Sequence, residues 1–265
     1  MIRLSAAVLI AAALFAAPAA AQQAVLLRYA PPAGQVSHYR TASQTWMQIP
    51  GMPSDSTRPT MTRTLYQTRT VTAVEAGTRT VTTTVDSSVQ DLGPMTGMMP
   101  GGDIFRGITI TQRLDSLGDV SSADVTTPPD ANPMIAQAMR SQASQRQFLL
   151  PARRVSPGDT WTSSDTMPLG EAQGGGHAII ELTYTLVKVD RSGGSPLATI
   201  SMTGAMSSDN PGAQGAPQGQ MTGTMVFDLD AGRLAHSTTT MTAQVQSPDG
   251  GQMPVRTVST TDLLP

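Results

Sequence analysis

Residues 180–186 read IELTYTL, and this stretch decides the fold class. In an extended chain, successive side chains point to opposite faces. The apolar residues of the stretch therefore share one face, and they are Ile180, Leu182, Tyr184 and Leu186. The polar residues between them face the other way. This alternation predicts a strand in an antiparallel sheet that has one buried face and one face in water.

The same alternation and the same turn residues extend through most of the chain. Val81, Val85 and Val89 are predicted to face the core, opposite a row of threonines and Asp86. Glu75-Ala76-Gly77 and residues 190–195, which contain two adjacent glycines, are typical of hairpin turns. We therefore expect a mostly β protein in which neighbouring strands are antiparallel.

Three landmarks recur in the same order in both halves of the chain, which predicts an internal duplication. A glycine precedes a strand at Gly34 and again at Gly158, and the hairpin of residues 68–85 resembles that of residues 182–202. A strand and turn beginning at Leu114 recurs at Leu229, 115 positions later. A sheet of ten or more strands tends to curl or split. The prediction is a large curved antiparallel sheet, either a half-barrel or two packed half-barrels.

One helix is predicted to connect the two units. Asn132 is a suitable N-cap, Pro133 suits the first helical position, and helix-favouring residues continue through Gln147. Its expected apolar stripe is Ile135, Ala138, Met139 and Ala143. The predicted organisation is a leader over residues 1–21, a first β unit over 22–127, the connecting helix over 128–150 and a second β unit over 151–265.

The first 21 residues have the pattern of a secretory signal peptide. Arg3 precedes a short apolar run, and Ala19-Ala20-Ala21 supplies a cleavage signal. We therefore expect the protein to be periplasmic or secreted, with no transmembrane segment. The chain has no cysteine, so disulfides and thiolate metal sites are excluded. The formal net charge of −2 and the lack of a basic stripe give no support for nucleic-acid binding.

Leu27, Tyr29, Gly34 and Tyr39 form one short motif, and a second consists of Pro151, Val155, Gly158, Asp159 and Trp161. Together with LDSLGDVSS at residues 114–122, these motifs resemble an exported bacterial family of β-rich envelope proteins of unknown function. The predicted curved sheet with a helix is also similar, at the level of fold, to the Lol-type periplasmic lipoprotein carriers. That resemblance implies a sheet that holds acyl chains, and it transfers no catalytic residue.

No catalytic site and no cofactor are predicted from the sequence. The histidines, His38, His177 and His236, lack metal-ligand spacing, and no nucleophile elbow, zinc-protease or P-loop motif is present. Asp228 and Asp230 precede a glycine turn, but the pattern of a calcium loop fails because position twelve is Thr239. An enzyme is therefore the least supported class.

The leading hypothesis is a non-catalytic envelope protein whose concave sheet face binds an apolar ligand, a lipid or a partner segment. The residues expected to line this site are Ile135, Met139, Trp161 and Tyr184. One alternative is a structural or assembly module with no ligand. A further alternative is Cu(I) binding by the thioethers of Met95, Met98 and Met99 in a glycine-proline loop.

Overall fold

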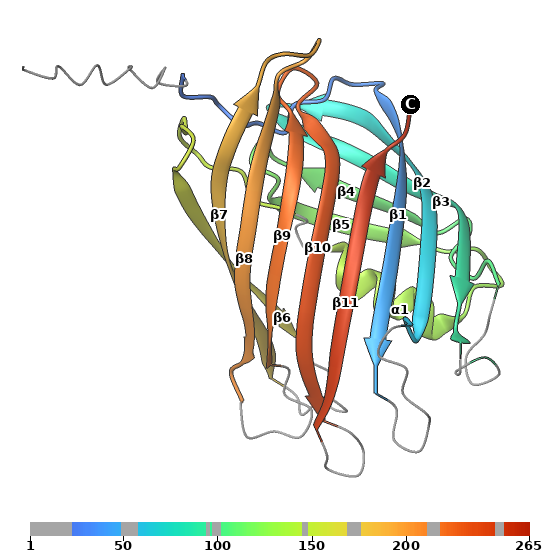
Figure 1. Ribbon diagram of the computed structural model, residues 1–265. Helices are drawn as coiled ribbons and strands as arrows, with labels where there is room; N and C mark the ends of the chain where they lie inside the picture. The colour runs from blue at the N-terminus through green and yellow to red at the C-terminus, as the bar shows by residue number, and fades with distance from the viewer. Residues whose placement is uncertain are drawn as a thin grey trace, which may run out of the picture.

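The computed structural model describes residues 23–48, 58–93, 96, 102–144, 148–168, 176–210, 218–246 and 252–265. Within these ranges the chain forms a mostly β structure with one helix between β5 and β6 (Figure 1). The elements are β1 (Val36–Met47), β2 (Met61–Glu75), β3 (Thr78–Asp91), β4 (Thr109–Leu114), β5 (Val120–Thr126), α1 (Pro133–Ala143), β6 (Thr160–Pro168), β7 (His177–Asp190), β8 (Leu197–Ser208), β9 (Gln218–Asp228), β10 (Arg233–Gln246) and β11 (Gln252–Leu263).

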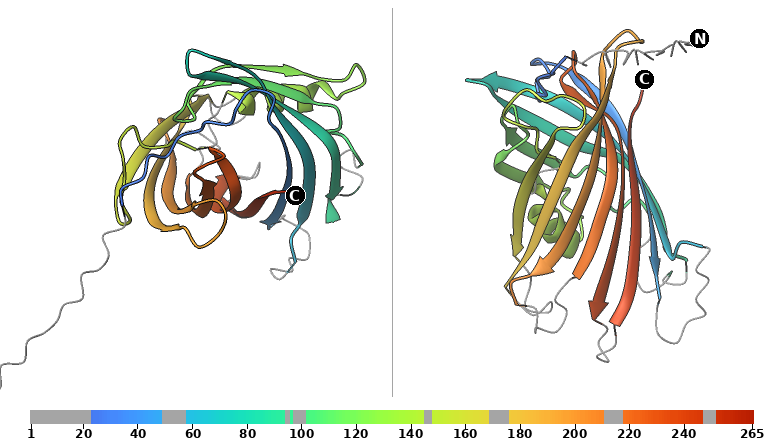
Figure 2. Two further views of the ribbon diagram at one scale, coloured as in Figure 1. Left: turned by 90° about the horizontal axis from the view of Figure 1, so that it is seen from above. Right: turned by 60° about the vertical axis from the view of Figure 1, so that its left-hand side comes forward.

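All the strands belong to one 11-stranded sheet in the order β5-β4-β3-β2-β1-β11-β10-β9-β8-β7-β6. Every pairing is antiparallel, and β1 pairs with β11, which joins the two halves of the chain into one surface. The strands β5 and β6 are the two edges, so the sheet stays open. Figure 2 shows that it curves strongly about its long axis. The predicted half-barrel is confirmed, and it is one continuous sheet.

Three glycines on the concave face permit close approach between neighbouring strands. A Cβ at Gly219 would lie 2.5 Å from the carbonyl oxygen of Thr242, and one at Gly223 would lie 2.6 Å from that of Thr238. A Cβ at Gly204 would likewise clash with neighbouring backbone. Glycines inside strands allow a sheet to bend more sharply than side chains would permit. These positions therefore help to produce the curvature of β8, β9 and β10.

The predicted alternation is confirmed in β7 but is wrong at the end of β3. Tyr184 and Leu186 are buried, and Glu181 is exposed, as expected. In β3, Val81 and Val85 are buried, but Val89 is 63% exposed. The pairing of β2 with β3 shifts register beside Val85, where Asp86 is an extra residue. Such a β-bulge reverses the faces of all residues beyond it.

Two segments outside the sheet cross one end of the half-barrel, which we call the closed end. Residues 24–31 and 148–156 pair with each other at Val25 and Val155, whose backbone groups exchange hydrogen bonds of 2.8 and 2.9 Å. The Tyr29 N–H donates to Ser116 and the Ala30 N–H to Gly232, so this segment contacts turns of both units. Leu27, Leu150 and Phe227 belong to the larger apolar cluster that fills this end.

The helix α1 packs on the concave side of β4 and β5. Ala143 lies in a second apolar cluster with Leu65 and Val85, and the Gln112 side-chain amide donates to the carbonyl of Ala143 at 2.6 Å. The predicted start at Pro133 is confirmed, and residues 145–147 lie outside the described ranges. The expected stripe needs one correction, because Ala138 is exposed and Ala136 is buried. The buried face of α1 consists of positions 135, 136, 139 and 143.

The structure repeats a backbone arrangement at the first two predicted landmarks. The Gly34 N–H donates to Val71, and the Gly158 N–H donates to Leu186, each at 2.8 Å. Both glycines have positive φ, and a register shift directly follows both Val71 and Leu186. These two acceptors are 115 positions apart, the spacing found in the sequence. The duplication stays a prediction, which this recurrence supports.

The predicted leader, residues 1–21, lies outside the described part of the chain. Among the residues that are described, there is no helix with the length and apolar character needed to cross a membrane.

Candidate functional site on the concave face

Six adjacent strands each present one partly exposed methionine on the concave face, near the end opposite the closed end. We call this set the methionine belt, and it consists of Met47, Met61, Met206, Met221, Met241 and Met253. Met221 and Met241 are directly paired across β9 and β10, and Met61 pairs with Thr45. Residues paired in register lie on one face of a sheet. The belt therefore extends over one face from β8 to β2, with Thr45 and Thr257 between Met61 and Met241 in the same row.

A group of hydroxyls lies between the methionine belt and the closed end. This hydroxyl patch consists of Thr41, Ser43, Ser237, Thr239, Ser259 and Thr261 on β1, β10 and β11. The Ser43 and Ser259 hydroxyls lie 2.9 Å apart, and those of Thr41 and Thr261 lie 3.2 Å apart. All six residues are half-buried. A hydroxyl offers one donor and two acceptor positions, so each pair keeps capacity for a ligand.

Arg63 projects from β2 onto the concave face beside this patch. Its register partner is Ser43, and its guanidinium carbon lies 5.1 Å from the centre of the Phe105 ring. Burial lowers the pKa of Arg63 from its ordinary value. Within the described ranges no carboxylate forms an ion pair with it. Arg63 is thus a partly buried cation that contacts an aromatic face and, within the part of the chain that the structure describes, no carboxylate.

Two more arginines lie near the closed end and contact tyrosines or hydroxyls of the chain itself. The guanidinium of Arg69 lies 5.3 Å from the centre of the Tyr39 ring, and Arg233 donates to the Ser37 hydroxyl at 2.6 Å. Burial raises the pKa values of Tyr29 and Tyr39, and the charge of Arg69 opposes that rise in both. These groups belong to the packed closed end and leave little surface for a ligand.

The four residues predicted to line a ligand site do not lie together. Trp161 and Tyr184 stack with ring centres 5.6 Å apart, and the Trp161 indole N–H donates to the carbonyl of Leu149 at 2.7 Å. Tyr184 is 1% exposed, so it is part of the core of the closed end. Ile135 and Met139 are half-buried against the second apolar cluster, on the other side of the concave face.

The sequence prediction missed the residues that the concave face brings together. The belt methionines are spread over about 200 positions, and only the strand order makes them neighbours. The available signal was that each of them occupies an apolar position within an alternating strand pattern. The proposed copper ligands, Met95, Met98 and Met99, lie outside the described residues.

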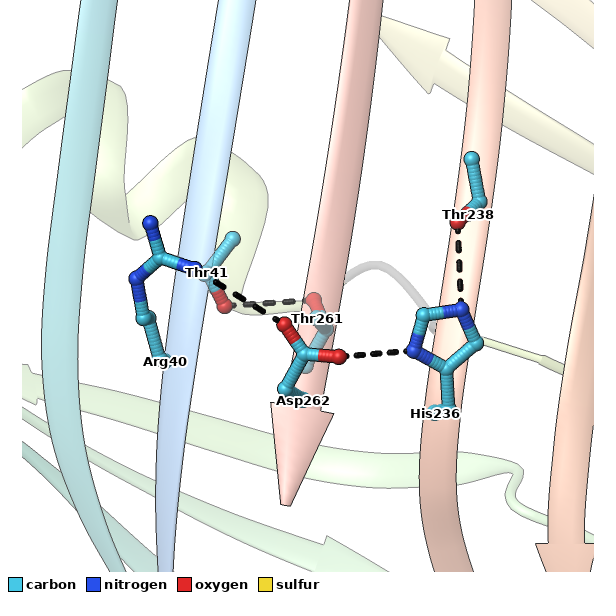
Figure 3. Close-up of polar contacts among 6 residues, drawn as sticks. All are labelled: Arg40, Thr41, His236, Thr238, Thr261 and Asp262. Atoms are coloured by element: carbon cyan, nitrogen blue, oxygen red, sulfur yellow. Dashed lines mark hydrogen bonds and ion pairs between the residues drawn. The ribbon is translucent and has the colours of Figure 1, made fainter. Parts of the chain in front are cut away.

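On the convex face, a histidine, a carboxylate and a hydroxyl meet across β10 and β11 (Figure 3). The Nδ1 atom of His236 lies 2.7 Å from Asp262, and its Nε2 atom lies 3.2 Å from the Thr238 hydroxyl. Arg40 approaches the same carboxylate at 4.0 Å. The order of groups is that of a hydrolytic triad. Thr238, however, lies inside a ladder with strands paired on both sides, so nearby backbone N–H groups are not available as an oxyanion hole. We interpret the group as a cross-strand contact.

The remaining histidines also contact polar groups on exposed surfaces. His38 contacts the Thr68 hydroxyl at 3.0 Å, and His177 contacts Asp209 at 3.0 Å. Hydrogen bonds from the backbone N–H and the ring of His177 hold the pKa of Asp209 below its ordinary value. The carboxylate of Asp228 accepts two backbone N–H groups in the turn that follows β9. In the described ranges, no cluster of three or more histidine or carboxylate side chains could hold a metal ion.

One family model matches part of the chain. Residues 133–234 match a family of unknown function (DUF6263). This segment includes the second of the two motifs, from Pro151 to Trp161, and the predicted resemblance to a family of unknown function is confirmed there. A search of curated protein sequences finds no significant match.

The solved structures found by comparison have only a distant likeness to this chain. A lipovitellin chain, from a structure of lipid–protein interactions, has a TM-score of 0.48 and 10% identity over 89% of this chain. The present chain spans 25% of that lipovitellin chain. Two mutants of a porin from Rh. blastica have TM-scores of 0.27 and 11% identity, with coverage of 87% of this chain and 99% of theirs. Likenesses at this level carry no functional information.

Proposed function

We propose that the protein is an exported, non-catalytic binding protein whose concave sheet face holds an apolar, lipid-like ligand. The observation that carries this proposal is the methionine belt. Half-buried methionines on six neighbouring strands leave apolar surface exposed on one face of the sheet, and clustered exposed apolar surface often marks a binding site. Methionine side chains are flexible and polarisable, and they suit surfaces that accept apolar ligands of variable shape. The predicted leader supports export.

The curvature of the sheet adds a second argument. An open sheet that bends around its own axis surrounds a bound chain on several sides, which removes more apolar ligand surface from water than a flat sheet would. Each buried methylene contributes about 0.8 kcal/mol. The alternative, a structural module without a ligand, leaves the belt with no function and predicts no saturable binding.

Binding of a fluorescent fatty acid to the delipidated full-length protein tests the proposal. Met221→Gln with Met241→Gln replaces the paired centre of the belt by polar side chains of similar length. Because the pair would lose apolar contact with several methylenes, we expect the dissociation constant to rise about tenfold or more. The control is Val89→Thr, a change of similar polarity on the convex face, which should bind like the parent. Absence of saturable binding by the parent would refute the proposed function.

A further inference from the structure

We infer that the ligand is amphipathic and that its polar end is an anion, which Arg63 binds at the edge of the hydroxyl patch. The inference rests on the proposed function and adds the chemistry of the head group. The concave face is not uniformly apolar. It changes from methionine to hydroxyl along the strands, and a cation lies on the boundary, two residues beyond Met61 on the same face of β2.

The environment of Arg63 is the first argument. A partly buried charge without a counter-ion is costly, and natural proteins usually pair it. Asp103, on the neighbouring loop, forms no ion pair with Arg63, and its Oδ1 atom accepts from the Ser88 backbone N–H at 2.5 Å and from the Ser88 hydroxyl at 2.7 Å. The Phe105 ring supplies a cation–π contact and no negative charge. A carboxylate or phosphate of a ligand would supply the missing counter-charge.

The geometry of the hydroxyl patch is the second argument. Ser43 is the register partner of Arg63, and Ser259 follows on the next strand, so the three residues form one row across the concave face. A guanidinium binds two oxygens of a carboxylate or phosphate at once. The hydroxyls of Ser43 and Ser259 can donate to an oxygen of the same anion by rotating.

The spacing along the strands fits a head group with a tail. Successive residues on one face of a strand are about 7 Å apart. Met61 lies one such step from Arg63, and the pair Met221 and Met241 lies in the same row as Met61. A tail that leaves the head group in this direction runs between Met61 and Met241, past Thr45 and Thr257, while the opposite direction leads to the packed closed end.

The test compares a fluorescent fatty acid, cis-parinaric acid, with its methyl ester, using the delipidated full-length protein. For the parent we expect the acid to bind at least tenfold more tightly than the ester, at a pH where the acid is ionised. Arg63→Gln should weaken binding of the acid about tenfold and leave ester binding unchanged. Arg63→Lys, which keeps the charge, should retain a preference for the acid. The matched control is Arg40→Gln, which removes the same charge from the convex face of β1.

The outcomes separate the two proposals. Equal binding of acid and ester by the parent, or equal behaviour of Arg63→Gln and Arg40→Gln, would overturn the inference and leave the proposed function standing. Failure of the parent to bind either probe would overturn both. The comparison of acid with ester in the parent needs no variant, so it remains decisive even when a substitution prevents folding. An alkyl phosphate, compared with the acid, then distinguishes the two kinds of anion.

Discussion

Replacing Val85 with alanine is expected to destabilise the protein far more than the same replacement at Val89. The two valines lie on one strand and are four residues apart, so a regular strand would place them on the same face. The β-bulge at Asp86 places them on opposite faces, with exposed fractions of 1% for Val85 and 63% for Val89.

The size of the effect follows from the methyl groups removed. Valine to alanine removes two of them, each worth about 0.8 kcal/mol when fully buried, and the cavity adds to this. Val85→Ala should therefore lower the free energy of unfolding by about 2 kcal/mol. Val89→Ala should change it by about 0.5 kcal/mol or less, as is typical of exposed positions.

Urea unfolding followed by circular dichroism measures both effects. The urea concentration at the midpoint should be lower for Val85→Ala, while the slope m stays unchanged. This combination indicates that the stability has changed and that the surface exposed on unfolding has not. In thermal unfolding, a loss of this size should lower the Tm by about 4 to 8 °C for a chain of this length. Equal losses for the two variants, or a larger loss for Val89→Ala, would mean that the bulge is not where the structure places it.

Three further predictions concern single contacts. Tyr39→Phe removes a buried hydroxyl that donates to Leu234 at 2.9 Å, and the unsatisfied carbonyl should lower the free energy of unfolding by about 1 to 2 kcal/mol in urea titrations. Gly223→Ala places a Cβ 2.6 Å from a backbone oxygen and should cost about 1 to 3 kcal/mol, whereas Gly193→Ala, whose Cβ would meet nothing within 4 Å, should cost far less. A backbone N–H and an arginine lower the pKa of Asp159 in the folded protein. The ionised carboxylate therefore contributes to the free energy of unfolding above the unfolded pKa of about 3.9, and this contribution is lost as the pH falls through the pKa of the folded state. Asp159→Asn should therefore lower the Tm at pH 7, and the difference from the parent should close in acid.

Local pattern was sufficient to predict the class of fold. Alternation of apolar and polar residues over stretches such as 180–186 depends only on the extended backbone, so it holds before any partner strand is known. The predicted hairpin turns at residues 75–77 and 190–195 then implied that the strands they join are antiparallel. The helix start at Pro133 was equally local, because a cap and a proline determine it within a few residues.

The errors arose where pairing between strands decides the outcome. The bulge at Asp86 is a feature of two strands together, and the sequence of β3 alone contains no sign of it. Ala136 and Ala138 have the same side chain, so only the direction from which β5 approaches decides which one is buried. The alignment of Arg63, Ser43 and Ser259 requires the pairing of β1 with β11, which joins segments more than 200 positions apart.

The composition of the concave face supports the proposed binding function over a purely structural role. A core that served only to stabilise the sheet would be apolar throughout, because buried hydroxyls and charges lower stability unless all their hydrogen bonds are made. Here the closed end contains a large apolar cluster, to which residues of the segments 24–31 and 148–156 contribute. Beyond it the same face carries half-buried hydroxyls and Arg63, followed by methionines that retain exposed surface. A concave face that changes in this order from polar to apolar matches a ligand with a polar head and an apolar tail. A packed interior does not require polar and apolar residues in this order.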